Sequence, residues 1–377
     1  MGRKSSYWEP ELRSVPLLEL HKNLGGNLGE FGGWLTSLDF GDPVQEHASV
    51  RTSAAFFDVS HMGRLVLRGS RVAEFLQKVV SKDITKVSKG TMSGPALLLN
   101  ERGGIIDDVM LYHVSDDTWF AVVNAPNIEK DLHWLTMWRD KLGYGDVEIE
   151  DVTEKSVLIA IQGPKSLEVM SSLGLEGLGK LKILQFLINV SLLGQEAVLI
   201  SRSGWTGEEV RSYGFEVWCS LELGEKIVKK LTEAGVRPAG LIARDILRLE
   251  AGYLLSGVDF DESITPVEAR YWMAYDTEKV GYVGSEAVRE RYLGGVDKVR
   301  VGLRFKKGER FVPRRGDSVL VGDKEVGYIT SGAYSTYLSR AIAIAYVSTR
   351  YAYIGGTVHV RSRGRVFEAK IVEPPFI

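Results

Sequence analysis

Two adjacent carboxylates, Asp107 and Asp108, are the residues of this sequence best suited to acid–base chemistry. They stand between an apolar pair and the apolar run of residues 109–114. Aspartate is depleted in strand interiors, because its short polar side chain favours turns and local backbone bonds. A carboxylate held away from water has a raised pKa unless it is paired, and proton-transferring groups are often prepared in this way. The residues alone leave a second interpretation open, an exposed bulge or turn after Gly104.

The strands around this pair predict what each carboxylate faces. Residues 105–114 and 118–123 have the composition of two strands, and the polar residues between them are typical of a turn. If the turn centres on Asp116, an antiparallel hairpin places Asp108 opposite Asn124. A carboxylate and an amide would then meet across the hairpin.

Alternation along the strand extends this predicted surface. Side chains of a strand point to opposite faces in turn, so Asp108, Met110 and Tyr112 share one face. Asn124 joins that face from the neighbouring strand, whereas Asp107 points the other way. The hairpin therefore predicts a carboxylate, a phenol and an amide on one surface of a sheet.

The composition is that of a soluble globular protein. The chain has 377 residues, of which 44% are hydrophobic and 25% charged, so two or three domains are expected. The 47 Lys and Arg residues nearly balance 49 Asp and Glu residues, which gives no overall basic field for nucleic acid or an anionic membrane. No apolar run approaches the roughly 18 residues of a transmembrane helix.

The single cysteine, Cys219, limits the chemistry further. It excludes a disulfide framework and a cysteine-based metal site within one chain. The histidines have no metal-ligand spacing, so no metal site is expected. These features fit the cytoplasm or another reducing soluble compartment.

The predicted secondary-structure pattern of the chain changes near Gly294-Gly295. Before that point, predicted strands alternate with predicted helices at 70–80, 127–138, 165–173, 223–234 and 241–250, with Ser70 and Asn127 as caps. Residues 19–28 are expected to be short helical or irregular segments. After residue 298, short strands alternate with Gly and Asp/Ser turns, which is typical of a small barrel or sandwich.

Several segments resemble, in order and over nearly the whole chain, the T protein of the glycine cleavage system, an aminomethyltransferase family. Each segment is weak evidence alone, but together they are a specific signal. Besides Asn100-Glu-Arg-Gly-Gly-Ile-Ile-Asp-Asp108 they are Pro16-Leu-Leu-Glu-Leu-His21, Glu46-His-Ala-Ser-Val-Arg51, Phe57-Asp-Val-Ser-His-Met-Gly63, Val122-Val-Asn-Ala125, Ile161-Gln-Gly-Pro-Lys-Ser166, Ser203-Gly-Trp-Thr-Gly-Glu208, Tyr213-Gly-Phe-Glu216, Pro238-Ala-Gly-Leu-Ile-Ala-Arg-Asp245, Leu247-Arg-Leu-Glu-Ala251 and Thr265-Pro-Val-Glu-Ala269.

The resemblance implies an α+β fold and a reaction. Residues 1–293 would form two interleaved folate-binding lobes, built from mixed or antiparallel sheets with helices, and residues 296–377 a C-terminal β-barrel. The implied activity transfers a one-carbon unit from the aminomethyl-lipoyl arm of the H protein to tetrahydrofolate, with release of ammonia. Tetrahydrofolate, or a modified pterin, would be the acceptor. The implied partners are the lipoylated H protein and the other components of the glycine cleavage system.

The resemblance also assigns residues, where they match. Asp108 matches the family's catalytic carboxylate, which helps the pterin-side amine attack the aminomethyl carbon. Met110, Tyr112 and Asn124 match positions that line the folate pocket. The remaining two matches are Glu216, an acid that reads the donor edge of the pterin, and Arg244, an arginine of the active site.

Three departures from the family pattern keep alternatives open. Trp205 stands where the family usually has tyrosine; its ring can still stack on a pterin, but the hydroxyl is lost. Pro95 replaces an expected aromatic residue, and the link of residues 208–213 is longer than usual. A folate-dependent demethylase of the same superfamily is therefore one alternative. The other is a folate-binding maturation protein without transferase activity, against which Asp108, Asn124 and Glu216 together argue.

Overall fold

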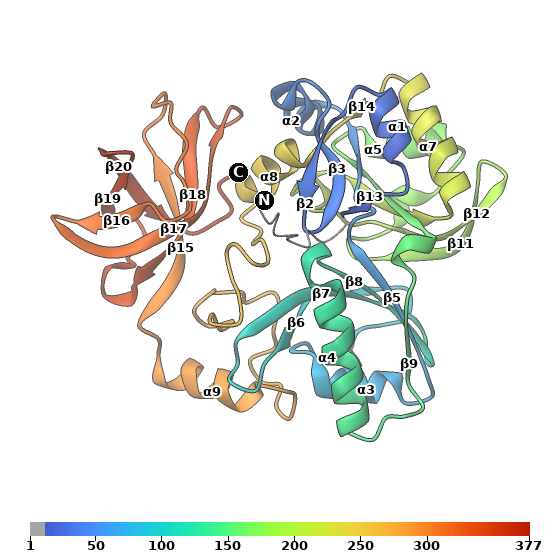
Figure 1. The fold of residues 1–377 in the computed structure, drawn as a ribbon, viewed down its shortest axis with the longest axis horizontal. Helices are drawn as coiled ribbons and strands as arrows, with labels where there is room; N and C mark the ends of the chain where they lie inside the picture. The colour runs from blue at the N-terminus through green and yellow to red at the C-terminus, as the bar shows by residue number, and fades with distance from the viewer. Residues whose placement is uncertain (1–11) are drawn as a thin grey trace, which may run out of the picture.

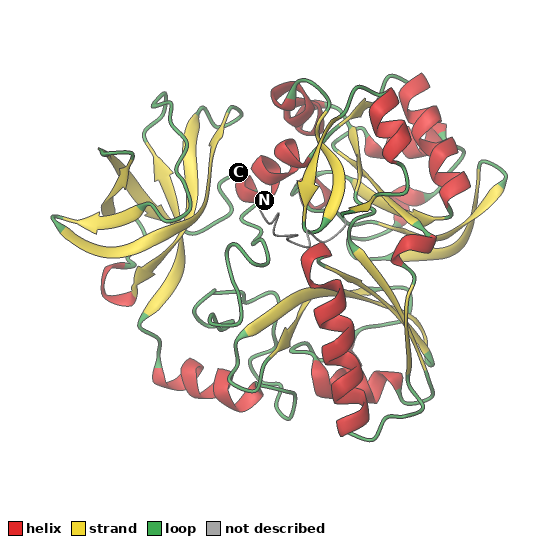
Figure 2. Ribbon diagram, viewed as in Figure 1, coloured by secondary structure: helices red, strands yellow, loops and turns green. Residues whose placement is uncertain are grey.

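Two β-sheets that pack face to face form the centre of the structure (Figure 1). The computed structural model describes residues 12–377, so residues 1–11 of the predicted 1–293 region lie outside the described part. Helices cover the outer face of each sheet, and a β-barrel lies to one side (Figure 2).

The first central sheet has five strands and is covered by helices α3 (Val72–Val79) and α4 (Ile128–Lys141). The apolar residues of α3 recur at three- and four-residue spacing, so one face of the helix is buried against the sheet. In spatial order the strands are β6 (Met92–Leu99), β7 (Ile105–Ser115), β8 (Thr118–Val123), β5 (Gly63–Arg68) and β9 (Glu148–Asp151).

The second central sheet has six strands and is covered by α5 (Ser166–Ser172) and α7 (Leu221–Glu233). Ser220 is the N-cap residue of α7, and its hydroxyl accepts a hydrogen bond from the Leu223 N–H. In spatial order the strands are β11 (Phe186–Leu192), β12 (Gln195–Ser201), β13 (Gly214–Cys219), β10 (Val157–Gln162), β4 (Ala55–Asp58) and β14 (Arg237–Pro238).

The inner faces of the two sheets share one apolar core. Tyr112 and Val122 from the five-stranded sheet pack with Leu158, Leu199 and Trp218 from the six-stranded sheet. Period-two alternation therefore directs every second residue of β7 and β13 to the space between the sheets. Polar residues on these inner faces must meet one another there.

The two lobes interleave, because the chain crosses between the sheets twice. Strand β4 belongs to the six-stranded sheet, whereas β5, which follows it, belongs to the five-stranded one. The chain returns between β9 and β10. Arg64 lies between the two crossings and is completely buried. Its guanidinium donates to the carbonyl oxygens of Ser60, Met62, Thr153 and Ser156, so it ties both crossings together.

A small three-stranded sheet and several short helices complete the two lobes. The sheet consists of β1 (Arg13–Ser14), β3 (Trp34–Asp39) and β2 (Asn27–Phe31). The helices are α1 (Leu18–Asn23), α2 (Pro43–Thr52), α6 (Glu208–Arg211) and α8 (Leu241–Glu250), with 3₁₀ turns at Ile84–Lys86, Ala125–Asn127, Thr153–Lys155, Leu178–Lys180 and Thr349–Tyr351. No helix within residues 12–377 is long and apolar enough to cross a membrane.

A closed six-stranded barrel follows helix α9 (Ser285–Gly294). It is joined to the lobes by apolar packing and by buried hydrogen bonds between barrel hydroxyls and charged residues of α8. Glu250 of α8 accepts hydrogen bonds from Arg51 and His47 and, at 2.5 Å, from the hydroxyl of the barrel residue Ser335. In spatial order the barrel strands are β15 (Lys298–Phe305), β18 (Arg340–Ser348), β17 (Lys324–Ser335), β16 (Ser318–Val321), β19 (Thr357–Ser362) and β20 (Arg365–Val372).

The predicted α+β class, the interleaved lobes and the C-terminal barrel are confirmed. The prediction for residues 19–28 is wrong in part, because β2 begins at Asn27 and pairs with β3 across the turn at Gly32 and Gly33. Ser70 is also not a cap: α3 begins at Val72, and the Ser70 hydroxyl donates to Asp146 instead.

We expect Arg64→Leu to lower the free energy of unfolding of the two lobes by at least about 3 kcal/mol, because several buried carbonyl oxygens would each lose a donor at about 1–3 kcal/mol. Urea unfolding followed by tryptophan fluorescence measures this, since all 8 tryptophans precede the barrel. Arg68→Leu on the same strand is the control. It removes an exposed ion pair with Glu150 and should cost under about 1 kcal/mol. Equal losses in the two variants would contradict the role given to Arg64.

Candidate functional site

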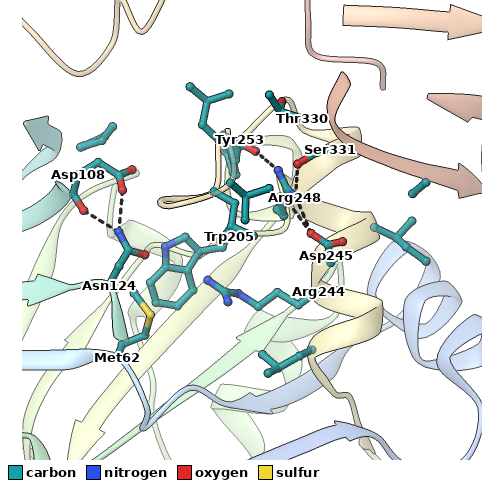
Figure 3. A pocket seen from close by; sticks show the side chains of 18 of the residues that line it. Met62, Asp108, Asn124, Trp205, Arg244, Asp245, Arg248, Tyr253, Thr330 and Ser331 are labelled. Carbon is teal, nitrogen blue, oxygen red and sulfur yellow. Dashed lines mark hydrogen bonds and ion pairs between the residues drawn. The ribbon is translucent and has the colours of Figure 1, made fainter. Parts of the chain in front are cut away.

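A cavity of about 820 Å³ opens where the two lobes, helix α8 and the barrel meet (Figure 3). Its lining is largely apolar, with a few polar side chains, which is the usual character of a small-molecule site. The polar and aromatic side chains that line it include Asp108, Asn124, Ser203, Trp205, Glu209, Glu216, Arg244, Asp245, Arg248, Tyr253, Tyr271, Thr330 and Ser331.

Asp108 reaches the cavity from β7. Its Oδ1 accepts a hydrogen bond of 2.7 Å from the Asn124 side-chain amide, and its Oδ2 accepts one of 2.6 Å from the Tyr271 hydroxyl. Both donors are neutral, so no cation compensates the negative charge directly. Burial, and next the charge of Asp107, raise the pKa of Asp108 to about 6. Such a carboxyl exchanges a proton readily near neutral pH.

The predicted hairpin register is confirmed. Tyr112 pairs with Phe120 and Met110 with Val122, so Asn124, just past the end of β8, comes opposite Asp108. The alternative of an exposed bulge is wrong, because both aspartates are paired within the sheet.

Asp107 points to the opposite face, as alternation predicted, and is completely buried there. It accepts two hydrogen bonds from Asn124, from the backbone N–H at 3.0 Å and from the side-chain amide at 2.9 Å. Asn127 donates a third, at 2.7 Å. Asn127 is at the N-cap position of α4, as predicted, but its side chain makes no capping bond because it donates to Asp107 and Ser256 instead.

Met110 lines the cavity, whereas Tyr112 lies behind the wall. The Tyr112 side chain is buried, with its ring edge-on to Phe186. Burial, and then the nearby charge of Glu216, raise its pKa well above the usual range of a tyrosine. Tyr112 therefore supports the wall of the site and does not itself line it.

Glu216 enters the cavity from β13 with one oxygen free. Its Oε2 accepts a hydrogen bond from the Ser203 hydroxyl, while its buried Oε1 has no partner among residues 12–377. Burial raises the pKa of Glu216 to about 7. The free oxygen can accept a hydrogen bond from a bound N–H group.

Arg244 lies against the ring of Trp205, and both side chains line the cavity together with Asn124 (Figure 3). The Arg244 guanidinium carbon lies 5.3 Å from the centre of the Trp205 ring, which is within cation–π range. The Nε of Arg244 has no partner in the described part of the chain. Burial, and next the charge of Arg248, lower the pKa of Arg244 to about 10, so the side chain stays cationic.

Three further residues of the site, Tyr271, Glu209 and Tyr253, were not identified from the sequence. Tyr271 lies on a loop far along the chain from Asp108, and only the tertiary fold brings the two together. Glu209 of α6 is buried and accepts a hydrogen bond of 2.7 Å from the Tyr253 hydroxyl. The longer link that contains Glu209 was the one hint, because it marked a reshaped loop at the site.

Comparison with protein families gives two matches that together cover most of the chain. The model described as the GCVT N-terminal domain matches residues 17–279. The model described as the glycine cleavage T-protein C-terminal barrel domain matches residues 298–377, the part that begins with β15.

Full-length relatives agree with these matches. A probable aminomethyltransferase of Aeropyrum pernix is 40% identical over 367 residues, which are 96% of both chains. An aminomethyltransferase of a Thermoanaerobacter species is 36% identical and covers 97% of both. The crystal structure of the glycine cleavage system aminomethyltransferase T of Bartonella henselae is similar, with a TM-score of 0.88 and 30% identity, and the match covers 97% of this chain and 98% of that one. The chain therefore belongs to the glycine cleavage T-protein family of aminomethyltransferases.

Proposed function

We propose that this aminomethyltransferase moves the one-carbon unit of an aminomethyl-lipoyl arm, presented by the H protein, to tetrahydrofolate with release of ammonia. Asp108 is the catalytic carboxylate. The observation that carries this proposal is the state of Asp108, a half-buried carboxyl at the cavity wall with a pKa of about 6 and two neutral hydrogen-bond donors. Residues 1–293 would form the folate-binding region and residues 296–377 the barrel domain.

The cavity fits a pterin ring. The free Oε1 of Glu216 suits the N–H donor edge of the ring, and Trp205 offers a flat face for stacking. Met110 and Asn124 would border the ring on the side of Asp108. When bound, a reduced pterin supplies the amines that accept the one-carbon unit. These contacts reach the ring alone, so tetrahydrofolate and a modified pterin both satisfy them.

The chain's own contribution is positioning and proton transfer. Asn124 and Tyr271 fix both oxygens of Asp108, so the carboxyl meets a bound amine in one orientation. In its ionised form Asp108 accepts a proton from the reacting amine, and its neutral form returns one to the leaving amine. The barrel closes one side of the cavity through Thr330 and Ser331, which helps to exclude water.

Arg244 and Glu209 have more general roles in this proposal. The cationic Arg244 holds Trp205 in place through its stacked guanidinium, and its unpaired Nε is available to an acceptor on the substrate. Glu209 orients Tyr253 at the opposite wall.

The choice of one-carbon donor is tested directly by turnover. Two residues that depart from the family pattern, Trp205 and Pro95, both line the cavity, so a demethylase that uses small methylated amines remains the competing activity. We expect formation of methylene-tetrahydrofolate and ammonia from aminomethylated H protein, and none of the folate product from small methylated amines. The reverse pattern would establish the demethylase. Folate binding without turnover of either donor would indicate a maturation protein.

Asp108→Asn should lower kcat by about 100-fold or more, because general acid–base catalysis contributes about 10²–10⁴-fold. The melting temperature should stay the same or rise, since the variant relieves repulsion between Asp108 and Asp107. The control is Asp116→Asn, at the exposed turn of the same hairpin, which should keep full activity. Near-normal turnover of Asp108→Asn would disprove the assignment.

Tyr271→Phe should raise the pKa of Asp108 above its value of about 6, because the Tyr271 hydroxyl bond favours the ionised carboxylate. The acid limb of the kcat profile should therefore move to higher pH, and activity should be lost first on the acid side. Tyr292→Phe, which changes an exposed ring, is the control. An acid limb that moves to lower pH, or does not move, would mean that Tyr271 does not act on Asp108.

A further inference from the structure

A third carboxyl, Asp131, lies buried behind Asp107 on the side away from the cavity. Asp131 is in the first turn of α4 and is completely buried. Neither of its oxygens has a hydrogen-bond donor among residues 12–377. The Asp107 side chain is within hydrogen-bonding reach of it. Two ionised carboxylates in such contact would repel strongly in a low-dielectric interior.

The donors around this pair all serve Asp107. Asn124 and Asn127 give three amide hydrogen bonds to Asp107 and none to Asp131. Among residues 12–377, the nearby cation is Lys130. Its partly exposed ammonium donates to the Ile106 carbonyl oxygen at 3.1 Å and lies 3.5 Å from Glu262 Oε1. The charged groups that act most strongly on Asp131 in the described part of the chain are Asp107, Lys130 and Asp108. The contact between the Asp131 and Asp107 carboxyl groups can therefore be made favourable by a proton shared between them.

The environment decides which carboxyl carries that proton. Amide donors favour the ionised form of the group that accepts them, and Asp107 accepts all three. Asp131 accepts no hydrogen bond, so nothing offsets the free-energy cost of burying its ionised form. Burial, and next the charge of Asp107, raise the pKa of Asp131 well above the usual range.

We propose that Asp131 is a neutral carboxylic acid at physiological pH, that it donates a hydrogen bond to Asp107, and that it thereby positions Asn124 against Asp108. The proposal rests on the proposed catalytic role of Asp108. Asp131 touches no substrate, so it is a positioning residue. It acts through Asp107, whose oxygens hold both the backbone N–H and the side-chain amide of Asn124.

The neutral state has a consequence for Asp108. An ionised Asp131 would add a second buried negative charge near Asp108 and raise its pKa further. When Asp131 is neutral, Asp107 is the main charged neighbour that raises the pKa of Asp108. The chain of contacts from Asp131 to Asp108 thus sets both the orientation of the catalytic carboxyl and the pH range in which it works.

Two substitutions separate the neutral from the ionised state. Asp131→Asn replaces the acid by an amide that can still donate to Asp107, so kcat and the acid limb of the pH profile should stay close to those of the unchanged protein. Asp131→Leu removes the donor and should lower kcat by roughly tenfold to a hundredfold through misplacement of Asp108, with little change in the KM for folate. Glu129→Gln, in the same helix turn but exposed, is the matched control.

An acid limb that moves to lower pH in Asp131→Asn would overturn the proposal, because it would mean that a negative charge had been removed. Full activity of Asp131→Leu would overturn the positioning role. If Asp131→Leu does not fold, Asp131→Asn still decides the question.

Infrared spectroscopy gives a readout that does not depend on activity. At a pH above the pKa values of Asp108 and Glu216, the carbonyl band of a protonated carboxylic acid should be present with equal intensity in the unchanged protein and in Asp108→Asn. It should be weaker by the contribution of one carboxylic acid in Asp131→Asn, where buried Glu209 and Glu46, whose pKa values are also raised, remain unchanged. Absence of that band from the unchanged protein would overturn the proposal and leave the role of Asp108 intact. Conversely, an active Asp108→Asn that keeps the band would refute the proposed function of Asp108 while Asp131 remains a neutral acid.

Discussion

The architecture depends on one buried guanidinium at the point where the two lobes exchange strands. Arg64 has no carboxylate within ion-pair distance in the described part of the chain, and its charge is satisfied by backbone carbonyl oxygens from both crossings. Buried arginine is tolerable only when nearly every N–H finds an acceptor, so the two crossings must hold one geometry. That geometry sets how the inner faces of the sheets meet. It also fixes Met62, which lines the cavity directly beside the crossing.

The site also contains buried charged groups whose partners are neutral, but here the groups are carboxylates. The fold places Asp107 and Asp108 on opposite faces of one buried strand, and then supplies neutral donors rather than cations. A cation would pair with Asp108 and lower its pKa, which would remove its capacity to exchange a proton near neutral pH. The cavity cation Arg244 instead lies against Trp205. The proposed catalytic role of Asp108 thus depends on a carboxyl whose charge the fold leaves without a direct cationic partner in the described part of the chain.

The features that follow from local pattern were predictable from the sequence, and those that depend on tertiary contacts were not. The turn at residues 115–117 and strand alternation sufficed to place Asp108, Met110 and Asn124 on one surface. The same alternation could not reveal that Tyr112 would be covered by Phe186, a residue of the other lobe. Tyr271 and Asp131 were missed because each meets its aspartate only through the fold. Asn127 was placed correctly, but the competition between capping α4 and bonding Asp107 could be judged only with Asp107 in view.

The pattern of strand exchange also bears on how such a protein can be assembled from parts. The whole five-stranded lobe, from β5 to β9, is one continuous stretch of chain that leaves the six-stranded lobe and returns to it at adjacent points. It is therefore an insertion whose two ends are clamped by Arg64. The six-stranded lobe, by contrast, is split in sequence and cannot be moved as a single segment. Recombination that respects these boundaries could exchange the inserted lobe or the barrel as a unit, whereas a single cut between β4 and β5 would separate β4 from the other strands of the six-stranded sheet.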